Sequence, residues 1–97
     1  MKITIEAKNG KVELEATATK ALGLIIADIP LNGGGIKFRV THQASGLAIG
    51  PLLGTRTRAL LMVKVLGELA DWTQSAAELA GETGLNEHVA DVVAVYS

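Results

Sequence analysis

The sequence predicts an α+β fold in which an antiparallel sheet of four to five strands packs on one long helix, followed by two short C-terminal helices. Three observations predict it: apolar and polar residues alternate in the first half, helical spacing begins near residue 57, and two shorter helical segments follow residue 72. A chain of 97 residues suits one compact core, so we expect residues 1–97 to form a single domain.

The clearest local pattern is a β-hairpin at the N-terminus. Asn9-Gly10 separates two alternating segments, and this dipeptide closes two-residue turns because it tolerates positive φ angles. A turn centred there places Ile5 opposite Leu14. One face of the hairpin is then apolar, with Ile3, Ile5, Ala7, Val12, Leu14 and Ala16.

Residues 18–31 are compatible with either a helix or a strand. The letters TATKALG favour a helix, whereas the following LIIADI favours a buried strand. We favour a strand that starts at Leu22.

Two further strands are predicted before the first helix. A flexible loop, Asn32 to Gly35, leads into an alternating segment, Ile36 to Thr41, which predicts a second hairpin. A turn, Gln43 to Gly46, then precedes a short strand, Leu47 to Ile49. Gly50-Pro51 is expected to end that strand.

A helical period runs from Thr57 to Trp72, with Thr55 or Thr57 as the candidate N-cap. Apolar residues surround most of this helix, and a helix of that kind must be covered on more than one side. The sheet can cover one side. Either the C-terminal segment or a second copy of the protein must cover another, so a homodimer through residues 57–72 is one expectation.

The C-terminal segment, residues 74–93, resembles bacterial helix-turn-helix sequences in its spacing of Ala, Gly and Val. Its second helix, however, offers Asn86, Glu87, His88 and Asp91 to the surface, with no Lys or Arg to meet phosphate. Carboxylates there would repel DNA, so we favour ordinary helix packing for this segment.

Charge is distributed unevenly along the chain. Residues 1–64 hold all nine Lys and Arg with four acids, and residues 65–97 hold six acids and no base. This asymmetry predicts either a basic surface for an anionic partner or charge complementarity within the molecule.

The basic half contains the candidate contact residues, which are Lys37, Arg39, His42, Arg56 and Arg58. Arginine pairs bidentately with carboxylate or phosphate, so this group could bind an acidic protein surface or a nucleic-acid backbone. A solvated sheet face is the alternative interpretation.

The residues for catalysis are few. Cysteine is absent, and His42 shares a turn with Ser45 but has no acid nearby in sequence to orient it. Glu87, His88 and Asp91 could suggest a metal site, but a solvated acidic helix face is the simpler interpretation. We therefore expect no enzyme activity, no metal and no cofactor.

The N-terminal residues alternate in polarity, and no apolar segment approaches the roughly 20 residues that span a bilayer, so we expect neither a signal peptide nor a membrane segment. The absence of cysteine suits a reducing compartment, and the cytoplasm is the expected location.

A family resemblance covers residues 36–73. The run Phe38 to His42, the Ser45-Gly46 turn, and a helix that starts at Thr57-Arg58 and ends in Leu69 to Thr73 resemble small uncharacterised proteins of phages and mobile elements. The resemblance implies a compact accessory protein. Some such proteins, including anti-CRISPR proteins, block host defence complexes.

Three hypotheses on function follow. The first is a non-catalytic protein that binds a host protein complex, as an inhibitor of the anti-CRISPR type would. The second is a small nucleic-acid-binding transcriptional regulator that uses the basic half of the chain, and the third is a cryptic hydrolase that uses His42.

Overall fold

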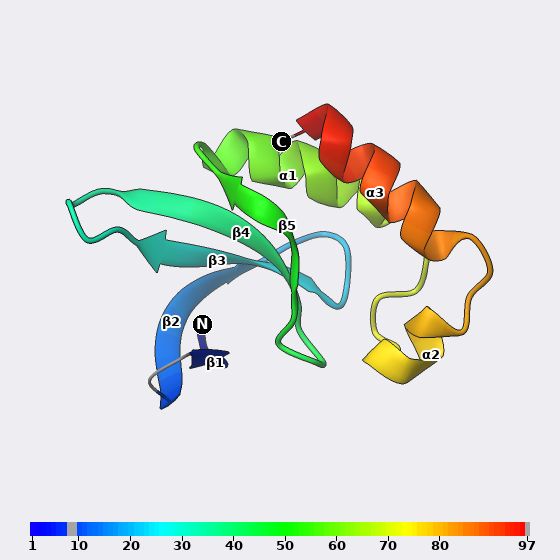
Figure 1. The fold of residues 1–97 in the computed structure, drawn as a ribbon, viewed down its shortest axis with the longest axis horizontal. Coiled ribbons are helices and arrows are strands. Elements are labelled where there is room, and N and C mark those ends of the chain that lie inside the picture. Colours follow the sequence, from blue (N-terminus) through cyan, green and yellow to red (C-terminus); the bar gives the residue numbers. More distant parts are fainter. Residues whose placement is uncertain (8–9, 97) are drawn as a thin grey trace.

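The computed structural model describes residues 1–7 and 10–96 and confirms the α+β fold. Five antiparallel strands form one sheet in the order β1-β2-β3-β4-β5, and the helices lie along one side of it (Figure 1). The elements are β1 (Lys2–Ala7), β2 (Gly10–Ala18), β3 (Leu24–Pro30), β4 (Ile36–His42), β5 (Ala48–Leu53), α1 (Arg56–Leu66), α2 (Ala76–Ala80) and α3 (Leu85–Tyr96).

The N-terminal hairpin forms as predicted, but its register differs by two residues. Ile5 lies opposite Val12 instead of Leu14, and Ala7 pairs with Gly10, which is therefore the first residue of β2. Asn9 of the predicted turn lies outside the described residues. A slip of two residues preserves the alternation of the two faces, so alternation alone could not distinguish the two registers.

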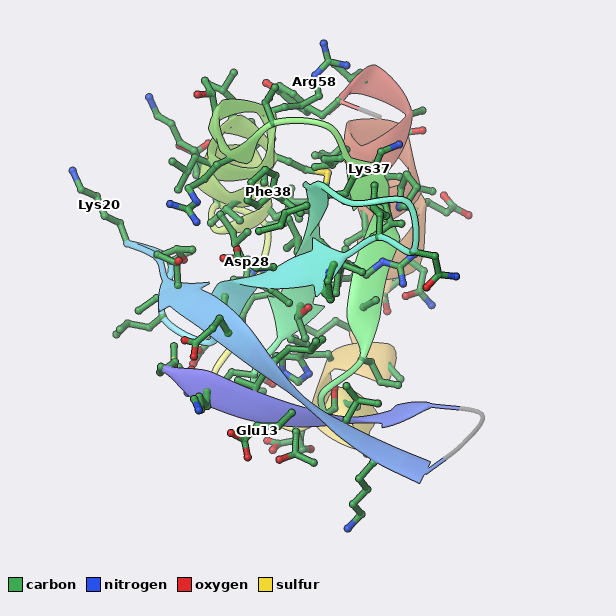
Figure 2. All side chains as sticks on the ribbon, turned by 90° about the vertical axis from the view of Figure 1, so that its left-hand side faces the viewer. Glu13, Lys20, Asp28, Lys37, Phe38 and Arg58 are labelled. Carbon is green, nitrogen blue, oxygen red and sulfur yellow. The ribbon has the colours of Figure 1, made fainter. Side chains whose placement is uncertain are left out.

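Strand β2 joins two parts of the sheet. Residues 10–15 pair with β1, and residues 16–18 pair with β3. The β1–β2 ribbon curves away from the other strands in Figure 2. Ile3 lines one hollow together with Ile25 and Thr41, so the hairpin folds over the sheet face that is turned away from α1. This contact explains why Ile25 is buried although it points away from the helices.

The strand interpretation of residues 18–31 is confirmed for β3, which starts at Leu24, two residues after the predicted start. The Leu24 amide donates to the Ala21 carbonyl at 3.0 Å, which makes a turn of residues 21–24. The Thr19 hydroxyl donates to the Leu24 carbonyl at 2.7 Å and holds the turn against the strand. The same hydroxyl accepts from the Ala21 amide at 3.2 Å, and a helix through residue 23 would have bonded that amide to the carbonyl of residue 17.

The prediction that Gly50-Pro51 ends the fifth strand is wrong, because β5 continues through both residues to Leu53. The register against β4 shifts between Phe38 and Val40, which marks an irregularity of the β-bulge type. Gly50 has a φ of 79° there. β5 is an edge strand, and an edge strand with a bulge tolerates a proline that donates no hydrogen bond.

The predicted helix over 57–72 is shorter than expected. Thr55 is the N-cap, since its hydroxyl accepts a hydrogen bond from the Arg58 amide at 3.2 Å, but α1 ends at Leu66. Gly67 packs directly against Ala21, and the chain then turns so that Trp72 enters the core. Burial of the indole outweighs continuation of the helix.

The second cover of α1 comes from the same chain. α3 packs along α1 and β5 on the side away from the centre of the sheet (Figure 1). Of the two predicted covers for this helix, the C-terminal segment is the one that the structure shows. The main core therefore combines sheet, helix and loop residues, which are Leu24, Ile26, Val40, Leu53, Ala59, Met62, Val63, Leu66, Trp72, Leu79 and Leu85.

A paired glycine substitution tests the tight contact between the 21–24 turn and the Trp72 segment. Gly23 has a φ of 92°, and a Cβ there would lie 2.2 Å from the Trp72 carbonyl oxygen. Gly34 has a φ of 95° but nothing within 4 Å of such a Cβ. We predict that Gly23→Ala lowers the free energy of unfolding by about 3 kcal/mol or more and Gly34→Ala by about 1 kcal/mol, measured by urea denaturation. Equal losses of unfolding free energy in the two variants would contradict the tight contact between Gly23 and the Trp72 carbonyl.

Candidate functional site

His42 lies at the end of β4 with 4% of its surface exposed, and it joins three segments of the chain. Its Nε2 is 3.0 Å from the Trp72 carbonyl oxygen and 2.9 Å from the Gln74 carbonyl oxygen. Carbonyl oxygens only accept hydrogen bonds, so Nε2 donates to them. The Ser45 hydroxyl is 2.7 Å from Nδ1 and also accepts from the Leu47 amide at 3.2 Å.

Trp72 links this histidine to the end of α1. Its indole Nε1 donates to the Leu66 carbonyl at 2.7 Å, and its ring packs edge-on against His42 at a centroid distance of 6.3 Å. The Leu66 carbonyl belongs to the last turn of α1, where backbone acceptors lack helical partners. The pair therefore caps the helix and attaches it to the sheet.

The loop after Trp72 is held by its own side chains. Asp71 accepts hydrogen bonds from the hydroxyl and the amide of Thr73, and these two bonds lower the pKa of the Asp71 carboxyl from its ordinary value. Ser75 and Glu78 then form a capping box that starts α2. Hydrogen bonds at both ends therefore hold the loop whose carbonyl oxygens accept from His42.

The hydrolase hypothesis depended on His42 and Ser45, and the structure does bring their side chains together. Both line an otherwise largely apolar pocket of about 210 Å³. Among the side chains that the structure describes, no carboxylate bonds either residue. Each of these hydrogen bonds of the histidine joins parts of the fold, which gives His42 a structural role.

The other predicted contact residues lie on two faces of the sheet. Phe38 faces α1 and the core, so the alternation of β4 places Lys37 and Arg39 on the opposite face. Arg39 is half-buried, and its Nε is buried without a hydrogen-bond partner. Arg56 and Arg58 are at the start of α1 and His42 is at the far end of β4, so the five residues do not form one patch.

Arg56 already has partners within the molecule. Its Nη2 is 3.4 Å from both carboxylate oxygens of Asp28, and its Cζ is 5.3 Å from the centre of the Phe38 ring. The guanidinium therefore attaches the start of α1 to the β3–β4 hairpin. Arg58 is exposed and extends beyond the helices in Figure 2.

A surface near the tip of that hairpin was not anticipated from the sequence. Ile36 is 53% exposed there and borders a hollow of about 250 Å³. We call this region the hairpin-end surface, and its residues are Glu13, Glu15, Asp28, Pro30, Ile36 and Arg56. Strand register brings together the residues of β2, β3 and β4, and the ion pair with Asp28 adds Arg56 of α1, so spacing along the chain gave no signal.

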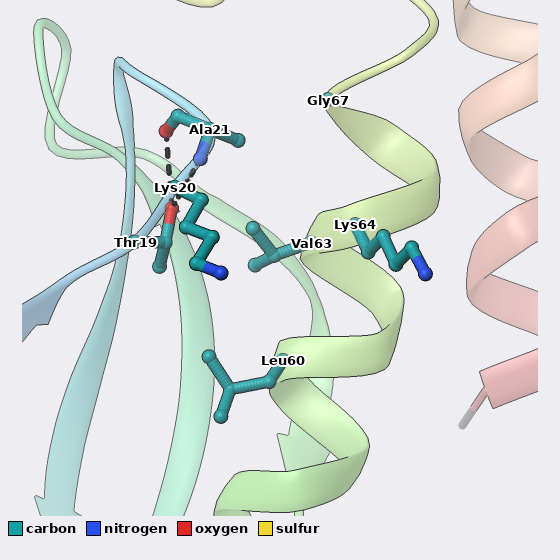
Figure 3. Close-up of a pocket in the computed structure, with 7 residues that line it drawn as sticks. All are labelled: Thr19, Lys20, Ala21, Leu60, Val63, Lys64 and Gly67. Atoms are coloured by element: carbon teal, nitrogen blue, oxygen red, sulfur yellow. Dashed lines mark hydrogen bonds between the residues drawn. The ribbon is translucent and has the colours of Figure 1, made fainter.

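A second unanticipated feature is a groove between α1 and the segment before β3, shown in Figure 3. It measures about 510 Å³ and is lined mainly by apolar groups, with two lysines. We call it the α1 groove, and its lining residues are Thr19, Lys20, Ala21, Leu60, Val63, Lys64 and Gly67.

Across residues 1–7 and 10–96, no group of three His, Asp or Glu side chains gathers in a way that could hold a metal ion. Within the same residues, none of the helices has the length and apolarity to cross a lipid bilayer.

No protein-family model matches this chain, and no curated protein or solved structure is significantly similar to it. The functional argument therefore depends on the geometry of these surfaces.

The two histidines provide a matched test of the structural role of His42. His42→Phe keeps a ring but removes the donor to two carbonyl oxygens, whereas His88 is exposed on α3. We predict a loss of about 2–3 kcal/mol in unfolding free energy for His42→Phe and less than about 0.5 kcal/mol for His88→Phe. Urea unfolding followed by the fluorescence of Trp72, the single tryptophan, measures both. Similar values for the two variants would refute the structural role.

Proposed function

We propose that this protein is a non-catalytic accessory protein of the cytoplasm that binds another protein through the hairpin-end surface. The resemblance of residues 36–73 to small phage and mobile-element proteins suggests the biological setting. In that setting, the partner would be a host defence complex and the protein its inhibitor, as for anti-CRISPR proteins.

The exposed side chain of Ile36 is the observation that carries the proposal. It lies beside Pro30 at the hairpin, next to a hollow that three carboxylates line, and one of these, Asp28, is paired with the Arg56 guanidinium. An apolar centre within a charged rim is the usual composition of a protein–protein contact. The loop of residues 33–35 leaves open space around its glycines, so no other part of the described chain covers this end of the molecule.

The charges at this surface favour a protein over a nucleic acid. Glu13, Glu15 and Asp28 line the hollow, and the nearby guanidinium of Arg56 is already paired with Asp28. A phosphate backbone placed there would meet carboxylates and would release few counterions. The alternative function, nucleic-acid binding by a small regulator, has support from exposed cations such as Lys37 and Arg58.

Affinity capture from bacterial lysate, with and without nuclease, tests protein binding. Ile36→Asp places a charge at the centre of the surface, and Leu47→Asp is its matched control because Leu47 is 61% exposed on the β4–β5 turn. We predict that a stoichiometric protein survives nuclease, is lost with Ile36→Asp and is kept with Leu47→Asp. The proposal would be contradicted if nuclease abolished capture, or if Ile36→Asp left capture unchanged.

A charge reversal tests the nucleic-acid alternative separately. The double variant Lys37→Glu and Arg58→Glu changes two exposed cations and leaves the Arg56–Asp28 pair intact. The protein-binding proposal predicts no salt-dependent nucleic-acid affinity in the parent chain, and hence no change in the variant. Binding that falls steeply with salt and is lost in the variant would support the regulator instead.

A further inference from the structure

The α1 groove has a closed end and an open mouth. At the closed end Gly67 meets Ala21 so closely that a Cβ on the glycine would lie 2.9 Å from the Ala21 Cβ. From there the groove runs between α1 and residues 19–21 toward Leu60, which is 44% exposed (Figure 3). Its volume of about 510 Å³ falls within the range of roughly 300–1,000 Å³ that small-molecule sites occupy.

Most of the groove is apolar, with Ala21, Leu60 and Val63 along it. The Thr19 hydroxyl is occupied by nearby backbone groups, because it donates to the Leu24 carbonyl at 2.7 Å and accepts from the Ala21 amide at 3.2 Å. The groove therefore offers a ligand apolar walls and few uncharged groups for hydrogen bonds. An aliphatic group suits such walls better than a polar one.

The ionic groups of the groove are both cationic. Lys20 and Lys64 line it, and no carboxylate does. Among the side chains that the structure describes, neither lysine has an acidic partner within ion-pair distance. Lys20 extends over the opening toward Val63, whereas Lys64 points to the other side of α1 in Figure 3. The charge favours an anion, and Lys20 is the nearer cation to a ligand in the groove.

We propose that the α1 groove binds an aliphatic carboxylate such as a medium-chain fatty acid. The alkyl chain lies along Leu60, Val63 and Ala21, and the carboxylate meets the ammonium of Lys20, which extends over the opening beside Val63 (Figure 3). This site is separate from the hairpin-end surface, with which it shares no residue. Its occupancy does not depend on the proposed function.

Three ten-carbon probes separate charge from apolarity. Decanoate, decan-1-ol and decyltrimethylammonium carry negative, neutral and positive head groups on the same chain, and each is titrated below its micellar concentration. Two-dimensional NMR of the protein gives both the site and the dissociation constant. We expect decanoate to bind most tightly and to shift the amides of residues 19–21 and 60–67. Octanoate should bind more weakly, by up to about fourfold for each methylene removed.

Variants with matched controls assign the two parts of the site. Lys20→Gln should weaken decanoate about threefold to tenfold and leave decan-1-ol unchanged, because only the ionic contact is lost. Leu60→Asp should remove detectable binding of both. The controls are Lys11→Gln, an exposed lysine on β2, and Leu61→Asp, whose parent side chain is 49% exposed on α1 but does not line the groove.

Two results would overturn the proposal. The first is that decanoate binds no tighter than decan-1-ol. The groove would then be a general apolar surface with no preference for a carboxylate, which a protein segment could also cover. The second is equal sensitivity to Lys20→Gln and Lys11→Gln, or to Leu60→Asp and Leu61→Asp. Because partner capture depends on Ile36, failure of the groove leaves that experiment unaffected.

Discussion

The buried imidazole of His42 is the interaction on which most of this structure depends. Its Nε2 donates to two carbonyl oxygens of the segment that follows α1, and Trp72 in that segment donates back to the last turn of the helix. A sheet residue, a loop and a helix end are therefore connected by directional bonds in a buried place, where an unmatched donor or acceptor is costly. Hydrophobic burial of the indole alone would not specify this arrangement, because it has no preferred orientation.

The same constraint positions both surfaces. With Trp72 held in the core, its carbonyl lies directly over Gly23, and Gly67 lies against Ala21. These two close approaches place the segment before β3 alongside α1 and so create the α1 groove. At the other end of α1, the Arg56–Asp28 pair attaches the helix to the β3–β4 hairpin and leaves Ile36 exposed. The helix thus has a fixed position between an apolar groove and a mixed-charge surface.

The sequence predicts the parts of this fold that depend on local patterns. Alternation identified β1, β2 and β4, and Thr55 was a correct N-cap candidate. The helix end was wrong because apolar residues continue past Gly67, and the bonds that draw Trp72 inward come from residues distant in the chain. The site was harder to predict. Lys20 and Lys64 are brought into one groove by a glycine contact, and Glu13 joins Ile36 only through strand register, so neither grouping has a spacing that a sequence can show.

One NMR measurement tests the central role of His42 most directly, namely the side-chain nitrogen–proton spectrum of the two histidines. The structure requires a hydrogen on Nε2 of His42, and its burial should make that hydrogen exchange slowly with water. His88 is exposed and serves as the internal reference in the same spectrum. A protected Nε2–H signal for His42 alone is the predicted result. A His42 ring without a hydrogen on Nε2, or one that exchanges as fast as His88, would contradict the account.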